Sequence, residues 1–123
     1  MTPDFERQQG ELLSLLGVEG RPVDESNYVH VSDSAERAAS VVGVHIADQP
    51  PFSGWQILAT TEAPALAKFG YCTVAELRDA HPAWLLALPL PAGWAFRCVG
   101  DTLIDCVFEG GERKVVNMSV SRP

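Results

Sequence analysis

The sequence lacks several signals that would assign a class of protein at once. No apolar run approaches the roughly 20 residues that a membrane-spanning helix needs, so we expect no membrane contact. The opening stretch, MTPDFERQQGELLSLLG, carries acids ahead of its apolar residues and no basic leader, unlike a secretory signal peptide. The chain has only three cysteines, at unrelated spacings, which fits a reducing compartment better than a disulfide framework. These absences predict a cytoplasmic protein.

Positive charge is scarce as well. Nine Lys and Arg residues stand against sixteen Asp and Glu residues, for a net charge of −7, and ten of the acids lie in residues 1–62. Phosphates would be repelled by such a surface, so we expect no nucleic-acid partner. An acidic half instead steers a basic protein partner, although a solvated face that only aids solubility is the alternative. The acids that we single out as partner-binding residues are Asp24, Glu25, Asp33, Glu36 and Asp48.

No grouping of histidines, cysteines or acids has the spacing of a metal or cofactor site. Zinc sites show close pairs such as Cys-x-x-Cys, whereas the nearest like pair here, Cys98 and Cys106, spans a predicted hairpin and is expected to pack as small apolar groups. The chain also has no Walker-type loop and no Gly-x-Gly-x-x-Gly. The sequence therefore predicts no metal and no cofactor.

Two further groups of residues raise the question of catalysis. Cys72 precedes a predicted helix start, which would lower its thiol pKa, and pairing with His81 is then conceivable, but no orienting third group or oxyanion hole is recognisable. Asp101 and Asp105 lie in or beside a hairpin, where carboxylates are expected to face solvent. We therefore predict no catalytic residue and no enzyme.

Local patterns predict an α+β domain with a single, mostly antiparallel sheet, an N-terminal helix and short helices between strands. Apolar residues at helical spacing over 3–16, ended by Gly17, predict the helix. Thr73 and Glu76 form a capping-box pattern, which places a short helix ending near His81. Strands are predicted over residues 28–32, 40–47 and 55–61, and in the last third of the chain over WAFRCV, TLIDCVFE and RKVVNMSV. Short helical pieces are predicted over residues 62–88.

The aromatic residues divide into two kinds. Trp55, Trp84 and Trp94 each open or lie in apolar segments, so we expect them in the core. Phe52 lies in a turn that is stiffened by prolines, where we do not expect its side chain to pack in the core. An ordered loop that carries an aromatic side chain loses little entropy on binding, so Phe52 joins the predicted partner-binding residues.

Several short motifs resemble a known family. The stretch YVHVSDSAERAASVVGVHIADQPPFSGWQILATTE contains a Val-Ser element, a Val-Gly strand and a Ser-Gly-Trp turn before a strand. Downstream follow Thr73-Val74, Pro82, LLALPL and PAGWAFR. Over about residues 28–97 this order resembles the bacterial immunity protein 33 family, whose members are encoded beside secreted toxins of interbacterial competition. The resemblance implies an antitoxin that binds and neutralises a cognate toxin in the producer's cytoplasm.

Two alternatives remain open at this point. One is a small metabolite-binding domain or cysteine-dependent enzyme that uses its cysteines or histidines in a pocket. The other is a self-associating module whose exposed strand edge pairs between copies to give a homodimer. In each case the length of 123 residues predicts a single domain, 1–123.

Overall fold

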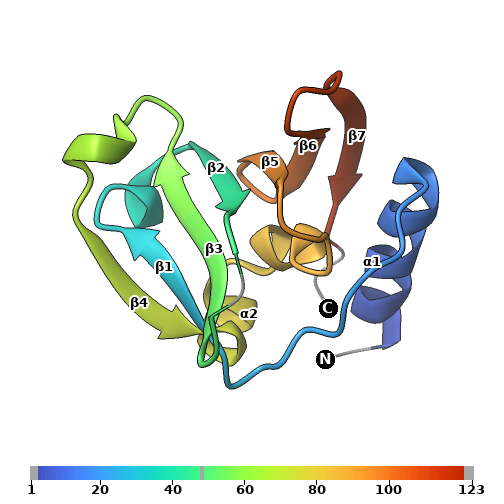
Figure 1. The fold of residues 1–123 in the computed structure, drawn as a ribbon, viewed down its shortest axis with the longest axis horizontal. Coiled ribbons are helices and arrows are strands. Elements are labelled where there is room, and N and C mark those ends of the chain that lie inside the picture. The colour runs from blue at the N-terminus through green and yellow to red at the C-terminus, as the bar shows by residue number, and fades with distance from the viewer. Residues whose placement is uncertain (1–2, 48, 121–123) are drawn as a thin grey trace.

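The computed structural model describes residues 3–47 and 49–120, which build a twisted sheet with helices packed against it (Figure 1). In chain order the elements are α1 (Pro3–Leu16), β1 (Tyr28–Ser32), η1 (Ala35–Arg37), β2 (Ser40–His45), β3 (Phe52–Ala59), η2 (Pro64–Leu66), β4 (Phe69–Thr73), α2 (Val74–Ala80), η3 (Pro82–Ala87), β5 (Trp94–Val99), β6 (Thr102–Phe108) and β7 (Lys114–Ser119), where η marks a 3₁₀ helix.

All seven strands belong to one open sheet, in the order β4-β1-β3-β2-β5-β6-β7. Neighbouring strands are antiparallel except β1 and β3, which run parallel. The predicted α+β fold, with a single mostly antiparallel sheet, an N-terminal helix and short helices between strands, is confirmed. Figure 1 shows β4 at one end of the sheet and β7 at the other, where it lies beside α1.

The core lies on one face of the sheet, which we call the inner face. Strand residues of alternating register, among them Ile57 and Phe96, pack there with residues of α1, α2 and η3 in one buried cluster. The three tryptophans are buried, as predicted. Gly43 lies opposite Phe96, and a Cβ at this position would come within 2.1 Å of the Phe96 ring. The glycine therefore leaves room for Phe96 to lie 5.4 Å from Trp55, measured between ring centroids.

The opposite, outer face of the sheet is less covered. Residues that alternate with the core positions, such as His30, Val44, Gln56 and Ala95, are half-buried. They come from four adjacent strands of the sheet. The outer face therefore presents side chains from several strands to solvent.

Local signals located most elements correctly. The helix over 3–16 is confirmed, and Gly17 follows it with a φ of +67°. The capping box is also confirmed, because the Glu76 N–H donates to Thr73 Oγ1 over 3.2 Å and the Thr73 N–H donates to Glu76 Oε1 over 3.2 Å.

Three expectations were wrong. The 62–88 segment is not only helical, since β4 occupies Phe69–Thr73 and pairs with β1. β3 begins at Phe52 rather than Trp55, so Phe52 is a strand residue and not part of a turn. Asp105 does not face solvent: its side chain is 2% exposed and accepts hydrogen bonds from Arg97 Nη2 and Arg113 Nη1, each over 2.8 Å. The two guanidinium groups supply the partners that a buried carboxylate needs.

Candidate partner-binding site

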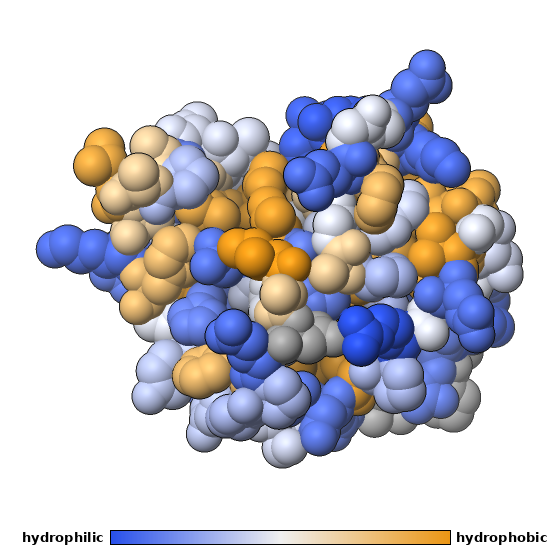
Figure 2. Space-filling view, viewed as in Figure 1, coloured by the Kyte–Doolittle hydropathy of each residue, from blue (hydrophilic) through white to orange (hydrophobic). Residues whose placement is uncertain are grey.

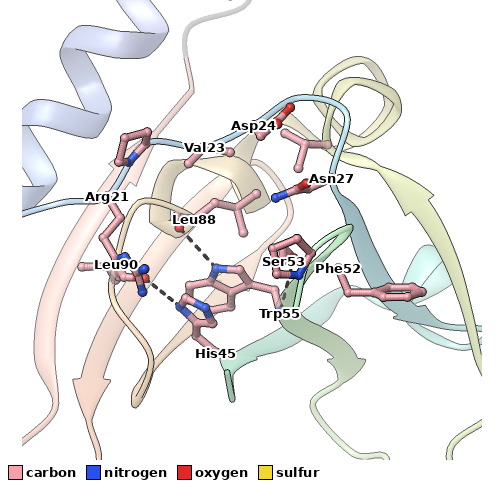
Figure 3. A pocket seen from close by; sticks show the side chains of 13 residues that line it. Arg21, Val23, Asp24, Asn27, His45, Phe52, Ser53, Trp55, Leu88 and Leu90 are labelled. Carbon is pink, nitrogen blue, oxygen red and sulfur yellow. Dashed lines mark hydrogen bonds between the residues drawn. The ribbon is translucent and has the colours of Figure 1, made fainter. Parts of the chain in front are cut away.

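The Ser-Gly-Trp motif, at the start of β3, borders a pocket of about 290 Å³ between the 21–27 loop and this strand (Figure 3). Trp55 Nε1 donates to the Leu88 carbonyl over 3.2 Å, and His45 Nδ1 lies 2.8 Å from the Leu90 carbonyl. The two rings stack with centroids 4.8 Å apart. Because these polar atoms hold the 88–90 segment against the sheet, Trp55 and His45 have a structural role in this pocket.

Gly54 explains why a small residue precedes the tryptophan. Its φ is +87°, and a Cβ there would lie 2.2 Å from the Ala47 carbonyl oxygen. The Ile46 N–H donates to the Gly54 carbonyl over 2.9 Å, so the two arms of the turn lie in close contact. The Ser-Gly-Trp motif, at the start of β3, thus lets this strand pack closely against the segment that follows β2.

The outer face of β4, β1 and β3 carries a cluster of five rings, which we call the aromatic cluster. His30 stacks on Phe52 with centroids 5.0 Å apart, and Tyr71 meets Tyr28 edge-on at 5.1 Å. Phe69 completes the cluster at 6.4 Å from His30. Tyr71 is 63% exposed, and Figure 3 shows the Phe52 side chain pointing away from the Trp55 pocket. Aromatic side chains that are held in place yet open to solvent are the residues that anchor protein interfaces.

Apolar exposure extends beyond the cluster. Ile46 is 57% exposed and lines a shallow pocket of about 300 Å³ with His30 and Phe52. In the space-filling view, apolar side chains form patches at the left, centre and right of the face, separated by polar ones (Figure 2). Such rimmed apolar patches are typical of surfaces that contact another protein.

The predicted acidic residues fall into two groups at opposite ends of β1. Asp24 and Glu25 precede this strand, whereas Asp33 and Glu36 follow it. Asp24 accepts hydrogen bonds from the Ser26 hydroxyl and N–H, which hold the pKa of Asp24 below its ordinary value. Glu25 forms an ion pair with Arg78.

Asp33 and Glu36 are both exposed and form no ion pair within residues 3–47 and 49–120. Asp48 lies outside the described residues. Asp24 and Phe52 both border the Trp55 pocket, although the Phe52 ring points away from it, and Asp33 and Glu36 lie at the far end of β1.

The cysteines are not activated as nucleophiles. Burial, followed by the charges of Glu76 and Glu36, raises the pKa of the Cys72 thiol, so the expected lowering by the start of α2 does not occur. His81 stacks on Trp84 with centroids 3.9 Å apart. Cys98 and Cys106 are buried in the core as predicted, and burial, followed by the charge of Asp105, raises the pKa of Cys106 to about 12.

Two further features are absent from the part of the chain that the structure describes. No group of three or more His, Cys, Asp or Glu residues lies close enough together to hold a metal ion. None of the helices there is both long and apolar enough to cross a bilayer.

Sequence reasoning missed four members of the aromatic cluster: Tyr28, His30, Phe69 and Tyr71. Tyr28 and His30 alternate with Val29 and Val31 in YVHVS, which indicates that both rings share one face. Phe69 and Tyr71 show the same spacing in FGYCT. Recognising this segment as a strand would have revealed the second pair, but only the sheet order brings the two pairs together.

A comparison with protein families gives the relationship of this chain. A model of the Imm33-like domain matches residues 8–109. The chain belongs to the Imm33-like family. The match includes most of α1 and all of β6, and so extends beyond the 28–97 segment on both sides. No curated protein and no solved structure matches the chain.

Proposed function

We propose that this Imm33-like chain is an immunity protein that binds and neutralises a cognate secreted toxin inside the cell that produces both. The observation that carries the proposal is the family match over residues 8–109, because immunity proteins act on toxins. Neutralisation here is by occupation of the toxin's surface, without a chemical step by the chain itself. The raised pKa values of the thiols support binding over catalysis.

The surface of the chain supports the same proposal. The aromatic cluster offers one exposed ring, Tyr71, and four half-buried rings on the less covered face of the sheet, and the net charge of −7 favours a basic toxin surface. The residues proposed to contact the toxin are those predicted from the sequence, Asp24, Glu25, Asp33, Glu36, Asp48 and Phe52, together with the remaining rings of the aromatic cluster.

The proposal requires a secreted toxin encoded beside this gene, and the test uses the toxic domain of that protein. Cells that express this domain in the cytoplasm should stop growing, and co-expression of the chain should restore growth. The purified chain should bind the same domain in a one-to-one titration. Restored growth without any direct binding would contradict neutralisation by occupation, and so would turnover of the toxin by the chain.

The charge contribution has a separate test. Reversing the charges of Asp24, Glu25, Asp33 and Glu36 together should lower the rate of association with the toxin domain. The difference in rate between the variant and the wild type should become smaller as the salt concentration rises, because exposed charges are screened. Reversing only Asp33 and Glu36 should retain most of this effect, since Asp24 and Glu25 already have partners within the chain. Stopped-flow mixing with the toxin domain measures the rates. Unchanged association rates at low salt would show that the acids serve solubility alone.

A further inference from the structure

The two edges of the sheet differ in how they are covered. At the β7 edge, α1 lies alongside the strand (Figure 1), Gln8 Nε2 donates to the Ser119 carbonyl over 2.7 Å, and Lys114 Nζ lies 3.5 Å from the Leu16 carbonyl. At the other edge, β4 pairs with β1 on one side and with no other strand of the described chain. An exposed strand edge is a template for another chain. The sequence of β4, FGYCT, has neither a proline nor a lysine to block such pairing.

The register defines which main-chain groups this edge presents. The Asp33 N–H donates to the Lys68 carbonyl and the Val74 N–H to the Asn27 carbonyl, each over 3.0 Å. Hydrogen-bonded pairs alternate along an antiparallel ladder, so Gly70 and Cys72 also bond to β1. The main-chain groups of Phe69 and Tyr71 therefore point away from β1, towards the open edge.

The two sides of β4 differ in chemistry. On the outer side lie the Phe69 and Tyr71 rings of the aromatic cluster. On the inner side, an open groove of about 460 Å³ runs along β4 and the end of β1, where it is lined by Asp33, Glu36 and Cys72. The charges of Glu76 and Glu36 help to raise the pKa of Cys72, which marks a negative potential there. A strand added to β4 would place alternate side chains on the two sides.

We propose that β4 is the docking edge for the toxin, and that it pairs with an extended segment of the toxin in which basic residues alternate with apolar ones. The inference rests on the proposed function and names the interface that carries it. Basic side chains of the segment would lie along the groove beside Asp33 and Glu36, and apolar ones would pack on Tyr71 and Phe69. Two acids, Asp33 and Glu36, and one base, Arg37, line the groove. Lys68 and Glu76 lie outside this lining, and with both included the acids still outnumber the bases by three to two.

Charge also argues against a second copy of this chain as the occupant. Pairing two β4 edges would bring together two chains of net charge −7, each with Asp33 and Glu36 beside its own edge. Like charges placed close together oppose association. A basic toxin segment removes this repulsion and pairs with the same acids.

The experiment measures amide hydrogen exchange of the chain alone and in complex with the toxin domain encoded beside its gene. Complex formation should slow exchange at Phe69 and Tyr71, because a partner strand would accept hydrogen bonds from both amides. A matched pair of variants then separates main chain from side chain. Y71P removes the outward N–H and the ring, whereas Y71V removes the ring alone. Affinity should fall by about 100-fold for Y71P and by about tenfold for Y71V, the range seen for interface anchors.

A second pair of variants tests the groove. Neutralising Asp33 and Glu36 (D33N, E36Q) should weaken binding by about tenfold, the scale of close charge pairs at interfaces. Neutralising Glu109 and Glu112, which are exposed beside the β6–β7 turn, should change affinity less than twofold and is the control.

The outcomes separate the inference from the proposed function. If the toxin domain binds but exchange at Phe69 and Tyr71 is unchanged, the docking edge is wrong and the immunity function stands. If the chain alone is a dimer that Y71P converts to monomer, the edge belongs to a second copy and the inference is overturned. If the toxin domain does not bind at all, the proposed function fails first. Should Y71P not fold, exchange in the native complex still decides the question.

Discussion

The β4-β1-β3 side of the sheet and the β5-β6-β7 side differ in the groups that they gather on their outer faces. On the first side, five aromatic rings lie together with Tyr71 exposed to solvent. On the second side, Asp105 is buried between Arg97 and Arg113. The edge strand β4 is open, whereas β7 has α1 beside it (Figure 1).

This contrast shows how one sheet can serve two purposes. The side that buries an ion-paired carboxylate and has a helix along its edge strand stabilises the fold. The β4-β1-β3 side leaves the aromatic cluster and the edge of β4 accessible, and such features are available to bind another protein. Stability should therefore depend more on the β5-β6-β7 side, and binding more on the β4-β1-β3 side.

The largest effect should come from comparing two phenylalanines. Phe96 of β5 is fully buried against Trp55, whereas Phe52 of β3 is half-buried on the outer face. F96A should lower the free energy of unfolding by about 4 kcal/mol, because it leaves a cavity in the core, and F52A by only about 1 kcal/mol. Urea unfolding followed by tryptophan fluorescence measures both.

The same pair should rank in the reverse order for binding. F52A should weaken the toxin domain's affinity, and F96A should leave it unchanged at temperatures where the variant remains folded. Equal stability losses for the two variants would mean that the outer face is as much a part of the core as the inner one, and the contrast would fail.

A smaller effect should follow from breaking the buried ion pair. D105N removes the charge shared by Arg97 and Arg113 and should cost about 2 kcal/mol of unfolding free energy. The loss stays modest because both arginine side chains are partly exposed, so the Nη groups that bond to Asp105 can regain water. E109Q, at an exposed position just after β6, is the matched control and should change stability by less than about 0.5 kcal/mol. Thermal unfolding of D105N at the wild-type midpoint would show that this network contributes nothing.

Sequence patterns were sufficient where a feature is local. The spacing of apolar residues predicted α1, and the Thr73-x-x-Glu76 pattern predicted the start of α2, because each depends on neighbours within one or two turns. The strands of the last third were likewise indicated by alternation between glycine-containing turns.

Features that depend on distant partners were not predictable in this way. β4 is stabilised by β1, about forty positions earlier in the chain, and its five residues include a glycine that weakens the local signal for a strand. Asp105 is buried because Arg97 and Arg113 reach it from both neighbouring segments. The aromatic cluster needs the parallel pairing of β1 with β3, which no local pattern specifies.

The smallest effect concerns an exposed carboxylate on the β4-β1-β3 side, to be compared with buried Asp105. Asp24 accepts hydrogen bonds from the Ser26 hydroxyl over 2.7 Å and from the Ser26 N–H over 2.9 Å, and these lower the pKa of Asp24 from its ordinary value of 3.8. As the pH falls below 3.8, the unfolded chain binds the proton before the folded chain does. The stabilising contribution of Asp24 is therefore present above pH 3.8 and is lost as the pH falls through the lower pKa of the folded state.

D24N tests this linkage with little change in structure, because the asparagine oxygen can still accept from Ser26 but does not titrate. Relative to wild type, D24N should show a smaller decrease in urea midpoint between pH 5 and about pH 3. The difference should be slight because the carboxylate is solvent-exposed, and raising the salt concentration should leave it nearly unchanged, since it comes from hydrogen bonds rather than from a distant charge. Identical acid dependence in the two proteins would mean that the turn before β1 forms without the charge of Asp24. The turn at residues 24–27, which leads into β1, would then be stabilised by its main-chain hydrogen bonds alone.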